Sequence, residues 1–141
     1  MLSGYTPQQK AARLAWWLAQ GARLTVEQVA TLLYGCRQNA RDAASAATRL
    51  LRSLAQVLPL RVEPVTQTWY AEAGAVREAF SAEQRGAVLA WTLAHGAALT
   101  CHEAAALLHI QRRGAYQMLA SLSGSIPIYD DEDTLTWQAC A

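Results

Sequence analysis

The sequence predicts a mainly α-helical fold with small β-hairpins, in which two copies of one unit follow each other along the chain. Three observations lead to this prediction: an internal repeat, helix-capping motifs that occur in both copies, and short β-prone segments that end each copy. The chain has 141 residues, of which 52% are hydrophobic, so it can bury a core and is not expected to be disordered. This length suits one ordinary domain or two very small ones.

The repeat covers nearly the whole chain. Residues 6–33 align without gaps on residues 81–108, at an offset of 75, and the match resumes further on at an offset of 68. The first copy therefore has seven additional residues between the two stretches, about two helical turns, which a longer helix can absorb. Equivalent pairs include Trp16 and Trp91, Gly21 and Gly96, Leu54 and Leu122, Pro59 and Pro127, and Trp69 and Trp137.

Each copy is expected to begin with a helix that starts at a capping box. Thr6 lies three residues before Gln9, and Ser81 lies three residues before Gln84, so a hydroxyl and an amide can satisfy the first free N–H groups. Apolar residues then recur at helical spacing. The repeated glycine follows each of these helices, where left-handed dihedrals are needed.

Two further helices are expected in each copy. Capping boxes at residues 25–28 and 100–103 open short second helices, which end near Leu33 and Leu108. A tight turn then leads to a third helix. The third helices are predicted at about residues 37–57 and 111–122.

Each copy is expected to end in a β-hairpin. β-Branched and aromatic residues flank turn-forming residues at Glu63-Pro64 in the first copy and at 130–133 in the second. Three helices followed by a hairpin is the order of a winged helix, whose second and third helices form a helix-turn-helix. The predicted strands are residues 58–62, 66–70, 126–129 and 134–137. The predicted domains are a first unit at residues 1–70, a linker at 71–79 with its hinge at 71–75, and a second unit at 80–141.

The five tryptophans are interpreted as packing residues. Trp16 and Trp91 share a repeat position and are expected in the core. Trp69 and Trp137 are expected to fasten each hairpin to its helices. Trp17, opposite Thr92, is expected to seal a contact between units or between subunits.

The second copy resembles the helix-turn-helix of DeoR-type and WYL-type bacterial regulators. Residues 99–119, LTCHEAAALLHIQRRGAYQML, are similar to the family's LT..EAA.LL..S.RTA.RDL pattern. The family's third helix enters the major groove, and the resemblance assigns that role to Arg112, Arg113 and Tyr116. Gln111 stands where the family usually has a serine at the N-cap. The resemblance does not extend to an effector domain, so it implies no ligand sensing.

Charge is distributed unequally between the two copies. Residues 1–70 contain eight basic and three acidic side chains, whereas residues 71–141 contain four basic and eight acidic ones, for a total net charge of +1. A polyanion would favour the first half. The two halves are therefore not expected to do equal work.

The start of the third helix in the first copy carries the residues that a DNA-reading helix needs. Arginine offers two hydrogen bonds that fit guanine, and asparagine or glutamine two that fit adenine. We therefore expect this helix to contact base edges in the major groove, although an ordinary solvated helix start is the alternative. The predicted reading residues are Arg37, Gln38, Asn39 and Arg41.

Other polar residues are secondary candidates. On the first hairpin, Arg61, Thr66 and Gln67 are candidate contacts to phosphates or to a minor groove, and an ordinary exposed hairpin is the alternative. Arg49 and Arg52 are interpreted as surface residues whose stems pack on the helix. In the second unit, four consecutive acidic residues would repel phosphate. Either this hairpin points away from DNA, or the second unit serves another purpose such as homodimerisation.

Several other classes of function are not expected. The chain has no Gly-rich phosphate loop, no arrangement of a nucleophile with an oriented base, and no complete ligand set around Cys101, His102 and His109, so we expect no enzyme, cofactor or metal site. No apolar run approaches the ~20 residues needed to cross a bilayer, and the start has no signal-peptide pattern, so a cytoplasmic protein with reduced cysteines is expected.

The sequence therefore predicts sequence-specific binding of double-stranded DNA by a small bacterial or mobile-element transcriptional regulator. The alternative belongs to another class. Tandem winged helices also serve as protein-binding scaffolds, as in accessory subunits of chromosome-condensing complexes, and the near-neutral total charge favours that role.

Overall fold

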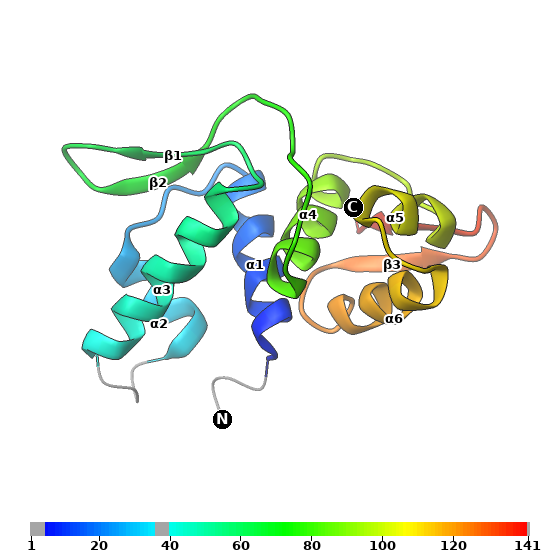
Figure 1. Cartoon of the computed structure of the whole chain (residues 1–141), viewed down its shortest axis with the longest axis horizontal. Helices are drawn as coiled ribbons and strands as arrows, with labels where there is room; N and C mark the ends of the chain where they lie inside the picture. Colours follow the sequence, from blue (N-terminus) through cyan, green and yellow to red (C-terminus); the bar gives the residue numbers. More distant parts are fainter. Residues whose placement is uncertain (1–4, 36–39, 141) are drawn as a thin grey trace.

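The computed structural model describes residues 5–35 and 40–140, and in this part of the chain it is mainly helical with two antiparallel β-hairpins (Figure 1). The order of three helices and a hairpin occurs twice. The first half comprises α1 (Pro7–Ala19), α2 (Val26–Tyr34), α3 (Ala40–Ala55), β1 (Leu60–Glu63) and β2 (Thr68–Ala71). The second half comprises α4 (Ala82–Ala94), α5 (Cys101–Leu108), α6 (Arg112–Leu122), β3 (Ile128–Asp131) and β4 (Thr136–Ala139).

All four predicted capping boxes are confirmed. At the start of α1, the Gln9 backbone N–H donates to Thr6 Oγ1 at 3.1 Å, and the Thr6 N–H donates to Gln9 Oε1 at 2.9 Å. By contrast, Gln111 precedes α6 without any side-chain cap hydrogen bond. Beyond α1 and α4, Gly21 and Gly96 have φ values of +96° and +93°, as the repeated glycine predicted.

The third helices differ in length between the two halves. The described part of α3 has 16 residues and α6 has 11, so additional residues of the first copy lie in the longer α3, as predicted from the repeat. α6 begins at Arg112, one residue after the predicted start, and α3 ends at Ala55, two residues before the predicted end, while the predicted start of α3 at 37 is not tested. Residues 36–39 lie outside the described part of the chain.

Each hairpin is fixed to the loop between the first two helices of its half. The Trp69 N–H donates to the Leu24 carbonyl at 2.7 Å, and the Leu24 N–H donates back to the Trp69 carbonyl at 3.0 Å. Trp137 and Leu99 make the same pair of bonds in the second half. Because both tryptophans also pack against the core, their predicted role in fastening the hairpins is confirmed.

The hairpin strands are shifted along the chain relative to the prediction. They begin at Leu60, Thr68, Ile128 and Thr136, each two residues later than the sequence suggested. In the first hairpin, the Glu63 carboxylate accepts hydrogen bonds from the backbone N–H groups of Val65 and Thr66, at 3.1 and 2.6 Å. These bonds hold the chain in a turn where β-propensity alone predicted a strand.

The two halves meet through their first helices. α1 and α4 lie side by side and run in the same direction (Figure 1). Small residues allow the close approach, because a Cβ added at Gly86 would lie 2.7 Å from Cγ and 3.1 Å from the backbone oxygen of Gln8. The buried small residues of these two helices are Ala11, Ala12, Ala15, Gly86, Ala87 and Ala90.

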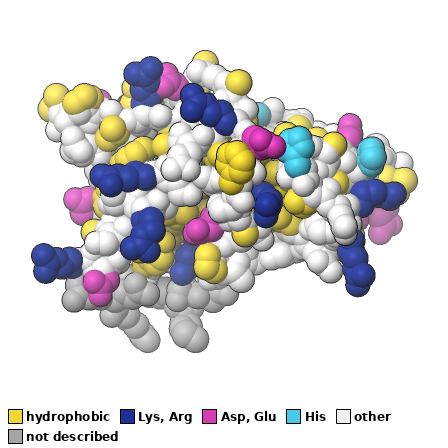
Figure 2. Space-filling model, in the orientation of Figure 1, with side chains coloured by type: hydrophobic (Ala, Val, Ile, Leu, Met, Phe, Trp, Pro, Cys, Tyr) yellow, Lys and Arg dark blue, Asp and Glu magenta, His cyan; other side chains and the backbone are white. Residues whose placement is uncertain are grey.

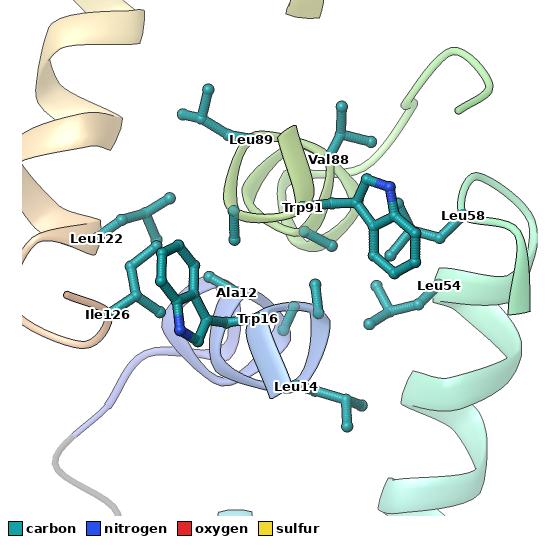
Figure 3. Packing of buried hydrophobic residues seen from close by; sticks show 14 of the residues in the cluster. Ala12, Leu14, Trp16, Leu54, Leu58, Val88, Leu89, Trp91, Leu122 and Ile126 are labelled. Atoms are coloured by element: carbon teal, nitrogen blue, oxygen red, sulfur yellow. The ribbon is translucent and has the colours of Figure 1, made fainter. Parts of the chain in front are cut away.

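Each half also completes the core of the other. Trp16 extends from α1 toward Leu122 and Ile126 of the second half, whereas Trp91 extends from α4 toward Leu54 and Leu58 of the first (Figure 3). The core position of both tryptophans is confirmed, since they are 8% and 5% exposed. The contacted residues are themselves repeat equivalents, so the exchange is symmetric and the halves share one core.

The segment between the halves lies along the first half. The Glu72 N–H donates to the Pro59 carbonyl at 2.9 Å, and the Arg77 N–H donates to the Val57 carbonyl at 2.8 Å. Val76 also packs against the core. The predicted linker is thus tied to the first half by backbone hydrogen bonds, one of them from the stretch predicted as its hinge. No helix in the described ranges is long and apolar enough to span a membrane.

Candidate nucleic-acid interface

One side of α3 presents a polar, arginine-rich surface, here called the α3 face. The polar residues of this face run from Arg41 to Gln56 at intervals of three or four positions, so they lie along one side of the helix. They extend over about 22 Å, at 1.5 Å per residue. Figure 2 shows Lys and Arg side chains gathered along this helix. A shallow hollow there is lined by Arg41, Ala44, Ser45, Thr48, Arg49, Arg52, Ser53 and Gln56.

The opposite side of α3 fixes this surface in place. Five apolar side chains point into the core, so rotation of the helix would expose them to water. They are Ala43, Ala47, Leu50, Leu51 and Leu54. The α3 face is therefore presented by an anchored helix.

The α3 face is cationic. Arg41, Arg49 and Arg52 are all exposed. Neither Arg49 nor Arg52 has an ion-pair partner among the described residues. The hydroxyl groups and the Gln56 amide on the same face add hydrogen-bonding capacity, which matches a ligand with many negatively charged oxygens.

Sequence reasoning placed only Arg41 of these arginines in the site. The structure brings Arg49 and Arg52, which were interpreted as stem-packing residues, onto the same face as Arg41. The signal was present in the spacing, because positions 41, 45, 49 and 52 share one side of a helix. The other predicted reading residues, Arg37, Gln38 and Asn39, lie outside the described residues.

The polar groups of the first hairpin are engaged within the protein. Arg61 forms an ion pair with Glu72, and this hydrogen bond raises the pKa of the Arg61 guanidinium. Gln67 adopts a φ of +56° at the tip and donates its amide N–H to the Pro64 carbonyl at 2.8 Å. The Thr66 hydroxyl donates to Glu63 at 2.6 Å. These three candidates have intramolecular partners, and none of them lines the hollow of the α3 face.

The second half presents a weaker counterpart to the α3 face. Arg112 and Arg113 are exposed in the first turn of α6, and Tyr116 follows one turn later, with its ring edge-to-face on Trp137 at 6.4 Å. Asp130 of the second hairpin borders the same hollow as Arg112 and Tyr116. The repeat equivalents of Arg49, Arg52 and Gln56 are Gln117, Ala120 and Gly124.

Metal chemistry finds no support in residues 5–35 and 40–140. No group of three or more His, Cys, Asp or Glu side chains there could hold a metal ion. His102 and His109 are both exposed, and His109 Nε2 lies 3.4 Å from Glu78.

Comparisons of the chain with models of protein families, with curated proteins and with solved structures gave no match. The resemblance of the two units to DeoR-type and WYL-type regulators therefore rests on the sequence pattern alone, which is clearest in residues 99–119. Function must be inferred from the surface of the molecule itself.

Proposed function

We propose that this protein binds double-stranded DNA through two tandem winged-helix units, and that α3 is its principal DNA-contacting helix. The observation that carries the proposal is the α3 face, on which Arg41, Arg49 and Arg52 are exposed along an anchored helix. A helix of this kind fits the major groove, whose width admits one α-helix.

The element order supports the winged-helix assignment. α2 and α3 take the places of a helix-turn-helix, and the β1–β2 hairpin takes the place of the wing. The pair of backbone bonds between Leu24 and Trp69 holds this wing beside the start of α2. We assign to the protein the role of a small transcriptional regulator.

The physical character of the α3 face predicts how binding would respond to salt. Each phosphate neutralised by an arginine releases condensed counterions, so log K falls with log salt by about 0.9 per contact. Arginines at 49 and 52 are too far along α3 to read the same bases as its first turn, so they suit phosphates. Arg112, Arg113 and Tyr116 would supply additional contacts from the second half.

The proposal is tested with a mixed-sequence 24-base-pair duplex and fluorescence anisotropy across a salt series. We expect Arg49→Ala and Arg52→Ala each to weaken binding and to reduce the salt slope by about 1. Arg49→Lys and Arg52→Lys are matched controls that retain charge, and they should keep most of this non-specific affinity. Unchanged binding by the double alanine variant would refute DNA binding through α3.

One observation favours a second candidate, a protein-binding scaffold. Leu32 of α2 is 52% exposed and borders a largely apolar hollow, and its repeat equivalent Leu107 is also exposed. Apolar surface of this kind suits a partner helix or peptide. If the arginine variants left duplex binding intact while Leu32→Asp abolished binding to a partner protein, the scaffold would replace DNA binding as the function.

A further inference from the structure

A buried glutamine of the second half lies directly behind the α3 face. Gln84, in the first turn of α4, is 4% exposed and is the buried polar side chain of the described core. Its Nε2 donates to the Ser53 carbonyl and to Gln56 Oε1, both at 3.0 Å. Ser53 and Gln56 both line the hollow of the α3 face. A residue of one half thus supports the binding surface of the other.

The capping box of α4 determines which way the Gln84 amide is turned. Gln84 Oε1 accepts from the backbone N–H groups of Phe80 and Ser81, at 2.9 and 3.3 Å. Because those groups are obligate donors, only the oxygen of Gln84 can face them, and its NH₂ group must face α3. The amide of Gln84 is then fully hydrogen-bonded.

This arrangement in turn sets the polarity of Gln56. The atom of Gln56 that meets the Gln84 NH₂ group must be an acceptor, so it is the oxygen. The remaining polar group of the Gln56 amide is its NH₂, which can only donate. Beside Arg52, an exposed donor matches the acceptor oxygens of a phosphate.

The second half contains an equivalent of the hydrogen bond from Gln84 to Ser53, but it has no equivalent of the Gln56 side chain. Gln9, the repeat equivalent of Gln84, donates its Nε2 to the Ser121 carbonyl at 2.8 Å, as Gln84 does to Ser53. Where the first half has Gln56, the second has Gly124, and a Cβ built there would lie 3.9 Å from Gln9 Nε2. Gln9 Nε2 also donates to Ser121 Oγ at 3.4 Å. The hydrogen bond between halves therefore has a structural role in both places, but only Gln84 orients a side-chain amide, that of Gln56 on the α3 face.

We propose that Gln84 is a positioning residue for DNA binding, which fixes the last turn of α3 and holds the Gln56 amide with its NH₂ group available to a backbone phosphate. This inference rests on the proposed function. It adds that the second half acts on DNA through the first half, from behind the contacting helix.

The substitution Gln84→Glu isolates this effect. A glutamate retains the oxygen that the capping box needs but has no N–H for α3. The Gln56 amide would then turn its NH₂ group inward, toward the carboxylate, and present its oxygen to the phosphate. We expect binding of the mixed-sequence duplex to weaken by about tenfold, which corresponds to about 1.4 kcal/mol. Gln9→Glu is the matched control and should leave duplex affinity unchanged.

A double-mutant cycle separates positioning from the added negative charge. If Gln84 acts through Gln56, the variant Gln84→Glu/Gln56→Ala binds the duplex as tightly as Gln56→Ala alone. An equal loss from Gln84→Glu in both backgrounds would show that charge repulsion is the cause and would overturn the proposal. An equal loss from Gln9→Glu would overturn it as well, because the effect would then be general destabilisation.

Two further measurements keep the test decisive. Should Gln84→Glu fail to fold by circular dichroism, the exposed substitutions Gln56→Ala and Gln56→Glu are compared, and affinity must fall in the order wild type, alanine, glutamate. Equal affinity of all three overturns the proposal. Loss of binding in Arg52→Ala with no effect at Gln84 or Gln56 would remove only the positioning role, whereas an intact Arg49→Ala/Arg52→Ala variant would remove the proposed function.

Discussion

The two halves of this protein are alike inside and different outside. Trp16 and Trp91 occupy equivalent positions and make equivalent contacts (Figure 3). Both halves also have the glutamine that hydrogen-bonds across to the other. On the surface, Arg49, Arg52 and Gln56 of the first half correspond to Gln117, Ala120 and Gly124 of the second. The repeat thus preserves what assembles the molecule, while the arginines extend along the length of α3 and are confined to the first turn of α6.

The largest expected effect tests whether the interior is truly shared. Trp16→Ala and Trp91→Ala should each lower the free energy of unfolding by about 3–5 kcal/mol, because each removes a large buried side chain. Since each tryptophan packs on the opposite half, both losses should appear in one cooperative transition of the whole chain. Urea unfolding followed by far-ultraviolet circular dichroism checks this. Two separate transitions, with only one shifted in each variant, would mean that the halves fold independently.

A smaller effect is expected where the symmetry between α1 and α4 is broken. Gly86 occupies the position equivalent to Ala11, and Gly86→Ala would press a methyl group against the backbone oxygen of Gln8. We expect a loss of about 1–2 kcal/mol, although glycine to alanine normally stabilises a helix interior by up to about 1 kcal/mol.

Gly114→Ala is the control for that substitution. Gly114 lies in α6, where the nearest atom to an added Cβ is Ile110 Cδ1, at 3.8 Å. This variant should melt at a higher temperature than the unaltered protein. If alanine raised the melting temperature at both glycines, the close approach of α1 and α4 would not constrain Gly86.

A substitution at the N-cap of α6 is expected to stabilise the second half. α6 is preceded by Gln111, which has an extended backbone but no side-chain bond to the helix. Gln111→Ser should place a hydroxyl at this cap and raise the free energy of unfolding by about 0.5–1 kcal/mol. Thermal unfolding measures the change, and Gln111→Ala is the control without a hydroxyl. Equal melting temperatures of the serine and alanine variants would contradict the prediction.

The smallest effect concerns pH and the first hairpin. Hydrogen bonds from Thr66 lower the pKa of the Glu63 carboxyl from its usual 4.5. A lowered pKa in the folded state means that ionised Glu63 stabilises the hairpin turn at neutral pH, and that this contribution is lost as the pH falls through the lowered value. The free energy of unfolding of Glu63→Gln should therefore depend less steeply on pH in that range than that of the unaltered protein. A Glu63 pKa of 4.5 or above, measured by NMR titration, would contradict the assignment.

Local features of the fold were predictable from the sequence, because their determinants lie within a few residues of each other. The capping boxes at Thr6 and Ser81 place hydroxyl and amide three residues apart, and the structure has both reciprocal bonds. The hairpin boundaries were less accurate, since the bonds from Val65 and Thr66 to Glu63 outweigh β-propensity in the turn.

Features that depend on how distant segments pack were not predictable in the same way. The positions of Trp16 and Trp91 in the core followed from the repeat, but their exchange between halves depends on the parallel packing of α1 and α4. The same packing places Gln84 behind Ser53, a pairing that spans 31 residues. Within the candidate site, helical spacing alone was enough to group Arg49 and Arg52 with Arg41. The ion pair between Arg61 and Glu72, which determines the role of Arg61, was not predicted from the sequence.

The parallel contact between α1 and α4 gives this chain an architecture that other proteins obtain only by association. Obligate homodimers dissociate and lose their structure on dilution, so their shape depends on protein concentration. Here the two halves are covalently linked through residues 72–81, so their pairing does not depend on protein concentration. The surface of α3 therefore keeps its support in a cell that contains only a few copies of the molecule.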